Sequence, residues 1–384
     1  MHKCILPWIS LETTPLGGVR PCCLYKDEIP EVNLRTHTLE EVFTGEYMNN
    51  LREVFERGDK PNACERCWME EDSGKKSKRE YMLEKFKHIP YETNLIFLDL
   101  KLGNICNLKC RICGSWSSSK WAQEQIEHYG DKHVAKQWLK DGQWPRKSPG
   151  FWDNLDSLLP NIKYFEFTGG EPFLIKQHFD LLQRAVDLGY AKDIDIHYNT
   201  NGTQFPKQHE VWKHFKHVQI AFSIDNTEKR FEYERDGAKW STVNNNIKRF
   251  LKMRDEGYPF SFQLCITWNL QNTYYMQDIL TWAKTSGIDD VHFNLMHDPE
   301  EYSLKNLPEK AYIKHLQRLD KAIVMHGKFA NQIRSIKNFM LLDPQVTTDR
   351  IIEKIRVTDE HREVSFADTH PEVAELIGYG STNR

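Results

Sequence analysis

The sequence predicts an α/β fold in which six parallel strands form an open, partial barrel. Three observations support this prediction. Apolar, strand-like segments recur along the middle of the chain, segments with helical apolar spacing lie between them, and residues with recognisable chemistry follow the strand-like segments. A chain of 384 residues is long enough for two or three domains with a stable core.

The strand-like segments alternate with helical ones. They are residues 95–102, 164–169, 194–200, 218–225, 260–268 and 291–296. Helical spacing is clear in residues 179–190 and 243–258. This alternation favours βαβ units and a parallel sheet. Six units are too few for a closed eight-stranded barrel, so we expect a partial (β/α)6 TIM-like barrel with its active site at the carboxyl ends of the strands.

Composition divides the chain into three parts. Residues 1–92 are irregular and rich in cysteine, residues 93–302 carry the strand and helix alternation, and residues 303–384 become helical. We therefore expect a small N-terminal metal-binding domain, a central barrel and a helical C-terminal extension.

Charge and hydrophobicity exclude some classes of protein. The net charge of -3 gives no general electrostatic reason for binding nucleic acid or a membrane surface. We find no apolar run near the roughly 18 residues that a spanning helix needs. A cytoplasmic location, where thiols stay reduced, is expected. Clustered cysteines then indicate metal or redox chemistry, and eight of the nine cysteines are clustered in the first third of the chain.

The most regular cluster follows the first strand-like segment. Cys106, Cys110 and Cys113 have the spacing C-x3-C-x2-C. A cubane iron-sulfur cluster held entirely by protein has four cysteine ligands, so three would leave one iron open. Catalytic zinc sites keep a free position in the same way. The alternative is a zinc site that a distant His or Cys completes.

The segment CNLKCRIC (106–113) resembles the cluster motif of the radical SAM superfamily. The resemblance implies that the open iron binds the amino and carboxylate groups of S-adenosylmethionine (SAM). An electron from the reduced cluster then cleaves SAM to a 5′-deoxyadenosyl radical, which abstracts hydrogen from a substrate. Ile112 is a departure, because the family commonly has an aromatic residue there, near the adenine.

The segment FTGGEPF (167–173) resembles the GGEP motif of the same family. The resemblance implies that Gly169, Gly170 and Glu171 contact the methionine amino group of SAM. Glycines allow a close approach of the backbone, and a glutamate supplies an anionic acceptor. Taken alone, the segment would be an ordinary turn between a strand and a helix.

Residues at the ends of the third and fourth strand-like segments extend the resemblance. Asn199, with Thr200, is a candidate for the ribose hydroxyls of SAM. Ser223, near Asp225, and Arg235 are the family's candidates for the methionine carboxylate, which an arginine can bind through two hydrogen bonds. Taken singly, each would be a surface or capping residue.

The cysteines before the barrel resemble the auxiliary iron-sulfur modules called SPASM and twitch domains, although those more often follow the barrel. Four ligands would hold one further 4Fe–4S cluster, and we assign them to Cys4, Cys22, Cys64 and Cys67. Cys23 is adjacent to Cys22, so in an extended chain the two side chains diverge. A structural zinc ribbon is the alternative for this domain.

The resemblance implies a radical SAM enzyme with a catalytic and an auxiliary cluster. We expect an oxidative modification of a peptide, protein or small metabolite, with a flavodoxin- or ferredoxin-type electron donor and no nucleic-acid or membrane partner. One alternative is a redox-neutral epimerase or mutase. Another is a zinc-bearing nucleic-acid-binding or scaffold protein that uses a basic stretch, which we otherwise expect to be a solvated face: Lys75, Lys76, Lys78 and Arg79.

Overall fold

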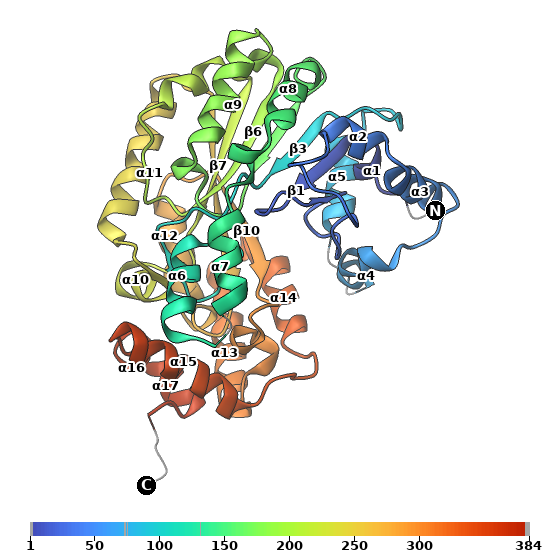
Figure 1. Ribbon diagram of the computed structural model, residues 1–384. Coiled ribbons are helices and arrows are strands. Elements are labelled where there is room, and N and C mark those ends of the chain that lie inside the picture. The colour runs from blue at the N-terminus through green and yellow to red at the C-terminus, as the bar shows by residue number, and fades with distance from the viewer. Residues whose placement is uncertain (1–2, 73, 75, 131, 381–384) are drawn as a thin grey trace.

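The computed structural model describes residues 3–72, 74, 76–130 and 132–380 and is built around one large twisted sheet (Figure 1). The sheet has eight strands in the order β10-β9-β7-β6-β5-β3-β1-β2. All six predicted strands are present in it, which confirms the partial barrel. Their bounds are β3 Phe97–Leu100, β5 Tyr164–Phe167, β6 Asp195–Thr200, β7 His217–Ser223, β9 Phe260–Trp268 and β10 Asp290–Leu295.

These six strands run parallel to their neighbours. Helices connect them and cover the outer face of the sheet (Figure 1). The helices of the barrel are α6 Ser119–His128, α7 Lys132–Asp141, α8 Pro149–Leu158, α9 Lys176–Asp187, α10 Glu228–Glu234, α11 Trp240–Asp255 and α12 Met276–Thr285. The segment before α8 contains α6 and α7, which pack against each other as a hairpin.

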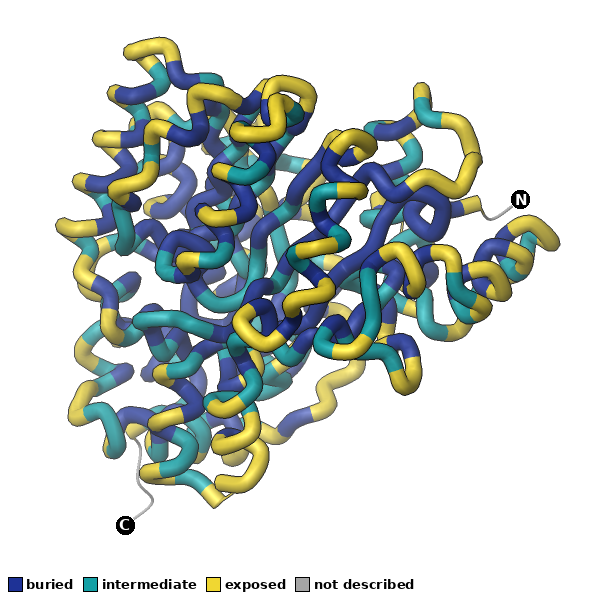
Figure 2. The backbone as a smooth tube through the Cα atoms, turned by 45° about the horizontal axis from the view of Figure 1, so that its top comes forward, coloured by how far each residue is buried: buried dark blue, intermediate teal, exposed yellow. Residues whose placement is uncertain are grey.

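The outer face of the sheet is apolar because alternate strand residues point toward the helices. Phe167 and Tyr198, in neighbouring strands, have stacked rings 5.3 Å apart, and Phe167 also contacts His178 of α9. All three side chains are fully buried or nearly so. In Figure 2 the strands accordingly run buried through the interior, while the outer turns of the helices are exposed.

The inner face of the sheet is polar. Asp99 of β3, Glu166 of β5, His197 of β6 and Gln219 of β7 are paired in one row across the sheet. The His197 Nδ1 and Gln219 Oε1 atoms are 2.8 Å apart. A row of this kind inside a barrel holds charged side chains close to whatever occupies its interior.

The N-terminal region joins the same sheet. β1 Ser10–Thr13 pairs in parallel with β3, and β2 Val19–Arg20 pairs antiparallel with β1. The sequence did not indicate these two strands. The N-terminal helices surround them at the right of Figure 1: α1 Leu6–Ile9, α2 Leu39–Thr44, α3 Glu46–Glu56, α4 Glu65–Asp72 and α5 Lys78–Lys85.

The C-terminal extension is helical, as the sequence predicted, and lies below the barrel in Figure 1. Its helices are α13 Glu309–Met325, α14 Ala330–Phe339, α15 Thr348–Arg362, α16 Phe366–Thr369 and α17 Pro371–Ile377. Within the described ranges, no helix is both long enough and apolar enough to cross a membrane.

Candidate cofactor sites

The loop that carries Cys106, Cys110 and Cys113 follows the carboxyl end of β3. Burial, with Cys110 close by, raises the pKa of Cys106 to about 12, and burial likewise raises the pKa values of Cys110 and Cys113. Each of the three thiols thus lies near another, and their buried surroundings disfavour the negatively charged thiolate form. A bound iron-sulfur cluster would supply the positive charge that three thiolates here require.

The first turn of α6 fixes this loop through hydrogen bonds to its backbone. The Trp121 indole N–H donates to the Cys110 carbonyl at 2.7 Å, and the Ser118 hydroxyl donates to the Leu108 carbonyl at 2.6 Å. The Ser119 hydroxyl lies 3.2 Å from both the amide nitrogen and the carbonyl oxygen of Cys106. These contacts hold the backbone at two of the three cysteines.

Arg235 lies directly beside the cysteine loop. The short strands β4 Lys109–Cys110 and β8 Arg235–Asp236 pair antiparallel, with Cys110 opposite Arg235. The Arg235 guanidinium donates to Asp225 at 2.6 Å and to the Cys110 sulfur at 3.8 Å. Its Nε has no hydrogen-bond partner among the described residues and is buried. The guanidinium can therefore still bind an anion next to the loop.

Ser223, at the end of β7, is partly buried and pairs in register with Cys265 of β9. Asp225, two residues later, receives the Thr267 amide at 2.8 Å as well as the Arg235 guanidinium. Burial outweighs the nearby guanidinium and raises the pKa of Asp225. The structure thus brings Ser223, Asp225 and Arg235 together, as the sequence had suggested, and ties two of them into an ion pair.

The turn after β5 crosses the cysteine loop at very close range. Gly169 and Gly170 have φ angles of +70° and +60°, in the left-handed region that favours glycine. A Cβ atom on Gly170 would lie 2.5 Å from the Ile105 carbonyl oxygen, one residue before Cys106. The Glu171 amide donates to that same carbonyl at 2.7 Å. Only glycine allows this contact between the two loops.

The Glu171 carboxylate is fully buried and accepts hydrogen bonds from the chain itself. The Thr200 hydroxyl donates to it at 2.8 Å and the Asn201 amide at 2.7 Å, at the end of β6. The Phe173 amide donates at 3.1 Å. Burial nevertheless raises the pKa of Glu171 to about 7. The side chain joins the ends of β5 and β6, so the acceptors for the amino group of SAM would more readily be backbone carbonyls of this turn.

Asn199 is on the polar inner face of β6, with its amide 3.5 Å from His197 Nε2. Its neighbour Thr200 points to the other face, to Glu171. Asn201, which the sequence did not single out, donates to Asn107 at 3.1 Å and to the Cys106 sulfur at 3.8 Å. An amide one residue beyond a strand end gives no sequence signal by itself, and only the fold shows that it reaches the loop.

Ile112 packs against an apolar cluster that joins the barrel, through Tyr233 and Tyr302, to the C-terminal extension, through Phe366. This position therefore contributes to docking of the C-terminal helices. The contact explains why an aliphatic side chain suits this position in the present chain.

A second set of cysteines lines a cavity in the N-terminal region: Cys4, Cys22, Cys64 and Cys67. Burial raises the pKa of Cys4 to about 12 and also raises the pKa values of the other three thiols. The cavity also has Lys78 and Arg79 in its wall. Four thiols with two cations around one space suit a negatively charged thiolate cluster.

Cys23 does not line this cavity and faces the barrel. The Lys78 ammonium donates to the Cys23 sulfur at 2.8 Å and lies 3.6 Å from Glu166 and 3.9 Å from Asp99. Burial acts to lower the pKa of Lys78, but Cys23, Glu166 and Asp99 raise it well above its usual range. The two adjacent cysteines therefore lie in different environments, Cys22 at the cavity and Cys23 next to Lys78.

The expectation that the basic stretch is a solvated face is wrong for two of its members. The Lys78 side chain is 16% exposed and contacts Cys23, while the Arg79 side chain is 11% exposed and binds Glu71 at 2.7 Å. The partner of Lys78 is a thiol far away in sequence, and the partner of Arg79 is a carboxylate on another helix, α4. Lys76 is exposed and pairs with Glu84. Lys75 lies outside the described residues.

The two cysteine sets lie at opposite ends of the sheet. β1 runs parallel to β3, so Cys4, which precedes β1, is near the amino ends of the strands. β2 returns antiparallel, which brings Cys22 to the same end. The Cys106 loop follows the carboxyl ends. In the described part of the chain, no group of three or more His, Cys, Asp or Glu side chains is close enough together to hold a single metal ion. This does not conflict with a cubane cluster, because its cysteine ligands bind separate irons and therefore stand further apart.

The C-terminal extension also contacts the cysteine loop. Arg111, whose side chain is fully buried, donates to Asp359 at 2.6 Å. Asp359 also accepts hydrogen bonds from the Tyr233 and Tyr379 hydroxyls and from the Phe366 amide, at 2.7 to 2.8 Å. One buried carboxylate thus links α15, α16 and α10 to a residue that directly follows a cysteine of the loop.

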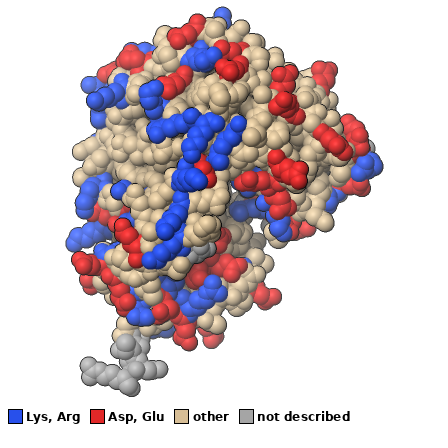
Figure 3. All heavy atoms as spheres, in the orientation of Figure 1, with Lys and Arg blue, Asp and Glu red and all other residues tan. Residues whose placement is uncertain are grey.

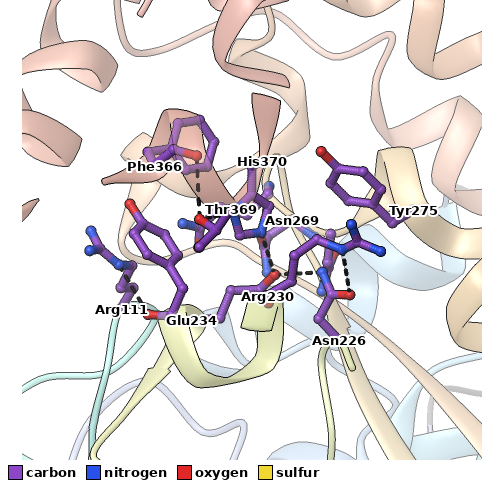
Figure 4. Close-up of polar contacts among 12 residues, drawn as sticks. Arg111, Asn226, Arg230, Glu234, Asn269, Tyr275, Phe366, Thr369 and His370 are labelled. Carbon is purple, nitrogen blue, oxygen red and sulfur yellow. Dashed lines mark hydrogen bonds and ion pairs between the residues drawn. The ribbon is translucent and has the colours of Figure 1, made fainter. Parts of the chain in front are cut away.

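A neighbouring polar cluster in Figure 4 completes this interface. Glu234 accepts the Asn226 amide at 2.7 Å, and its carboxylate lies 3.0 Å from His370 Nε2. Burial raises the pKa of Glu234 to about 7 and lowers that of His370 well below its usual value. Glu234 directly precedes Arg235 in the chain. The C-terminal helices therefore support both arginines at the cysteine loop, Arg111 through Asp359 and Arg235 through its neighbour Glu234.

Two sets of buried or partly buried cysteines, at opposite ends of a partial parallel barrel, suit an iron-sulfur protein. The sequence profile of the radical SAM superfamily matches residues 100–282, and that of an iron-sulfur cluster-binding domain, SPASM, matches residues 4–68. The chain thus carries a radical SAM domain and, before the barrel, a SPASM domain. The two matched domains indicate that the cofactors of this chain are 4Fe–4S clusters and SAM.

The chain is similar to the radical SAM cyclopropyl synthase TigE of Paramaledivibacter caminithermalis, at 22% identity over 262 residues. The match covers 65% of this chain and 52% of TigE, so the chain spans about half the length of this relative. Among solved structures, anSMEcpe with bound AdoMet matches at 19% identity and a TM-score of 0.42, over 62% of each chain. SuiB of Streptococcus suis, bound to the precursor peptide SuiA, matches at 13% identity and a TM-score of 0.36, over 90% of this chain and 70% of SuiB.

The glycine contact between the two loops yields a test. We expect Gly170→Ala to weaken SAM binding at least tenfold, because the added methyl group pushes the Ile105 carbonyl and the cysteine loop apart. The matched control is Gly189→Ala, where φ is +82° but no atom lies within 4 Å of the new Cβ. It should lose about 1–2 kcal/mol of stability from the left-handed backbone alone. Equal SAM affinities in the two variants, measured by equilibrium dialysis, would contradict the assignment.

The Arg111–Asp359 ion pair yields a second test, of whether the C-terminal helices influence the cysteine loop. Asp359→Ala leaves a buried guanidinium without its anion, and we expect it to cost about 3–5 kcal/mol of unfolding free energy in urea melts. Asp359→Asn, which keeps the shape, should instead alter the EPR spectrum of the cluster at the loop with a smaller loss of stability. The exposed Asp368→Ala is the control. A cluster spectrum unchanged in Asp359→Asn would mean that the C-terminal helices only stabilise the fold.

Proposed function

We propose that this protein cleaves SAM reductively at a cluster on Cys106, Cys110 and Cys113 and uses an auxiliary cluster on Cys4, Cys22, Cys64 and Cys67. The observation that carries the proposal is the close crossing of the cysteine loop by the Gly169–Gly170 turn at the carboxyl ends of the strands. When bound and reduced, the cluster supplies the electron that cleaves SAM to methionine and a 5′-deoxyadenosyl radical, which abstracts hydrogen from substrate.

The residues around the loop bind and orient SAM. The backbone of Gly169 and Gly170 faces the methionine amino group, and Ser223 and Arg235 bind the carboxylate, with the free Arg235 Nε as a donor. Asn199, on the inner face of β6, receives the ribose hydroxyls. Glu171 acts as a positioning residue that holds the ends of β5 and β6 under the cofactor.

The substrate occupies the inner face of the sheet, between the two cysteine sets. This face carries Asp99, Glu166 and His197 in one row, with Lys78 reaching it from the N-terminal region. A substrate here would lie between the Cys106 loop at one end and the N-terminal cysteines at the other. That order supports an oxidation, in which a cluster held by the N-terminal cysteines would accept an electron from the substrate radical.

We propose an oxidative modification of a peptide, protein or small metabolite, which makes the enzyme an oxidoreductase. The relative named as a cyclopropyl synthase supports formation of a carbon–carbon bond. A redox-neutral epimerase or mutase would regenerate SAM, so 5′-deoxyadenosine would stay below the amount of product. An electron donor of the flavodoxin or ferredoxin type completes the system.

The test of the catalytic site is SAM cleavage together with iron content. Reconstituted wild type should hold about eight irons, as in two cubane clusters, and should release 5′-deoxyadenosine with dithionite. The triple variant Cys106→Ala/Cys110→Ala/Cys113→Ala should hold about four irons and release none. A triple variant that still cleaves SAM would contradict the site, and a wild type loaded with zinc would favour the scaffold alternative.

Two neighbouring cysteines form a matched pair of variants for the auxiliary site. Cys22→Ala should lose the auxiliary cluster because this thiol lines the cavity with the other three. Cys23→Ala should keep all of the iron, since its thiol contacts Lys78 outside that set. Iron and labile sulfide analysis separates the two. Loss of iron in Cys23→Ala with retention in Cys22→Ala would reverse the assignment.

A further inference from the structure

Lysine side chains form a stripe along one face of α7. Lys132, Lys136 and Lys140 are four residues apart, which places them on one side of the helix, and all three are exposed. Arg146 and Lys147, in the turn after α7, are exposed as well. Figure 3 shows this blue stripe on the face of the molecule in view, over α7 and the segment that follows it. We call these five residues the α7 stripe.

The α7 stripe is largely unneutralised. Among the ion pairs of the described residues, none involves the side chain of Lys132, Lys136 or Lys140, whereas Lys147 lies 3.6 Å from Asp141. Asp141 also pairs with Arg35, and Glu127 of α6 is an exposed acid nearby in the hairpin. The whole chain has a net charge of -3, so this cationic surface stands out against an anionic molecule.

The helix below the stripe is bonded to the cysteine loop. The Asn104 amide donates to the Gly142 carbonyl at 2.9 Å, just after α7, and its side chain donates to the Trp138 carbonyl at 3.4 Å. The same side chain donates to the Ser115 carbonyl at 3.0 Å. Asn104 thus ties α7 to both ends of the loop that holds the three cysteines.

The rest of the hairpin covers the loop directly. α6 packs against α7, and its first turn binds the backbone of Cys106 and Cys110. The loop itself reaches the surface at Trp116, which is 42% exposed and three residues after Cys113. A protein that docks on this hairpin is separated from the loop by little more than one layer of helices.

We propose that the α7 stripe is the docking surface for a small acidic protein that carries single electrons. The inference rests on the proposed function, which requires one electron from outside for each SAM cleaved. That electron leaves the reduced flavin or iron-sulfur centre of the partner and enters the cluster at the cysteine loop, and no covalent bond forms. Opposite charges bring the two proteins together quickly and align their redox centres.

The position of the stripe favours this partner over an RNA. A phosphate backbone needs cations along an extended groove, usually with aromatic side chains on which bases stack. The stripe is confined to one face of α7 and the turn after it, and the segment that carries it is attached to the cysteine loop. An acidic redox protein gains from that position, whereas RNA binding does not depend on it.

The experiment uses a bacterial flavodoxin as the probe and the variant Lys132→Glu/Lys136→Glu/Lys140→Glu in the full, reconstituted chain. Binding of oxidised flavodoxin is measured by calorimetry, and cluster reduction by reduced flavodoxin is measured by stopped-flow absorption. We expect the variant to weaken binding and to slow reduction by about tenfold or more. In wild type, both should weaken steeply between about 50 and 500 mM salt.

The control variant is Lys248→Glu/Arg249→Glu/Lys252→Glu, an equal change of charge on exposed positions of α11, which lies apart from α7 in Figure 1. It should behave as wild type within about twofold if the effect is local. Dithionite, which needs no docking surface, should drive SAM cleavage equally in all three proteins. If the glutamate variant of α7 fails to fold, Lys→Gln at the same three positions gives the same test with a smaller effect.

Three results would overturn the proposal. Flavodoxin binding and reduction could be unaffected by the α7 variants, or the α11 control could slow as much. The α7 variants could instead lose affinity for RNA in salt-dependent binding while flavodoxin reduction stays intact. Failure of the proposed function has a different signature, because wild type would then release no 5′-deoxyadenosine even with dithionite.

Discussion

The parallel pairing of β1 with β3 is the constraint on which the arrangement of the two cysteine sets depends. It extends the barrel sheet into the N-terminal region, so that one rigid element carries Cys4 at one end and the Cys106 loop at the other. Ion pairs of the buried Glu12 carboxylate reinforce the joint: Glu12 of β1 binds Arg20 at 2.7 Å and also pairs with Lys101, which follows β3. A hinged module would leave the distance between the two sets variable, whereas a shared sheet fixes it.

Both cysteine sites have cations nearby that can compensate the negative charge of thiolates. Thiols whose pKa values burial raises surround both sites, and cations stand near each: Arg235 beside Cys110, Lys78 and Arg79 at the N-terminal cavity. Lys78 also contacts carboxylates of the inner barrel face, so it connects the N-terminal site with the substrate region. The C-terminal helices act on the same loop through Arg111 and Asp359, which are 248 positions apart.

Much of the fold could be predicted from the sequence because its signals are local. The six strands have apolar alternation or continuous apolar runs, the cysteine triplet and the two glycines follow strand ends, and Arg235 comes shortly after the fourth predicted strand. The strands β1 and β2 were missed because SLET and VR are too short to show a period. Lys78 and Arg79 read as a solvated basic stretch because their partners, Cys23, Glu166 and Glu71, are not apparent from neighbouring positions. The choice between Cys22 and Cys23 likewise depends on which way the chain turns after β2.

The central claim is that one chain holds two distinct clusters, of which only the one at the carboxyl ends of the strands binds SAM. EPR spectra of the dithionite-reduced protein, recorded with and without SAM, test this most directly. We predict two overlapping cubane signals, one of which shifts when SAM is added and disappears in the Cys106→Ala/Cys110→Ala/Cys113→Ala variant. A SAM-dependent shift that persists in this variant would contradict the account, and so would a wild-type signal that SAM leaves unchanged.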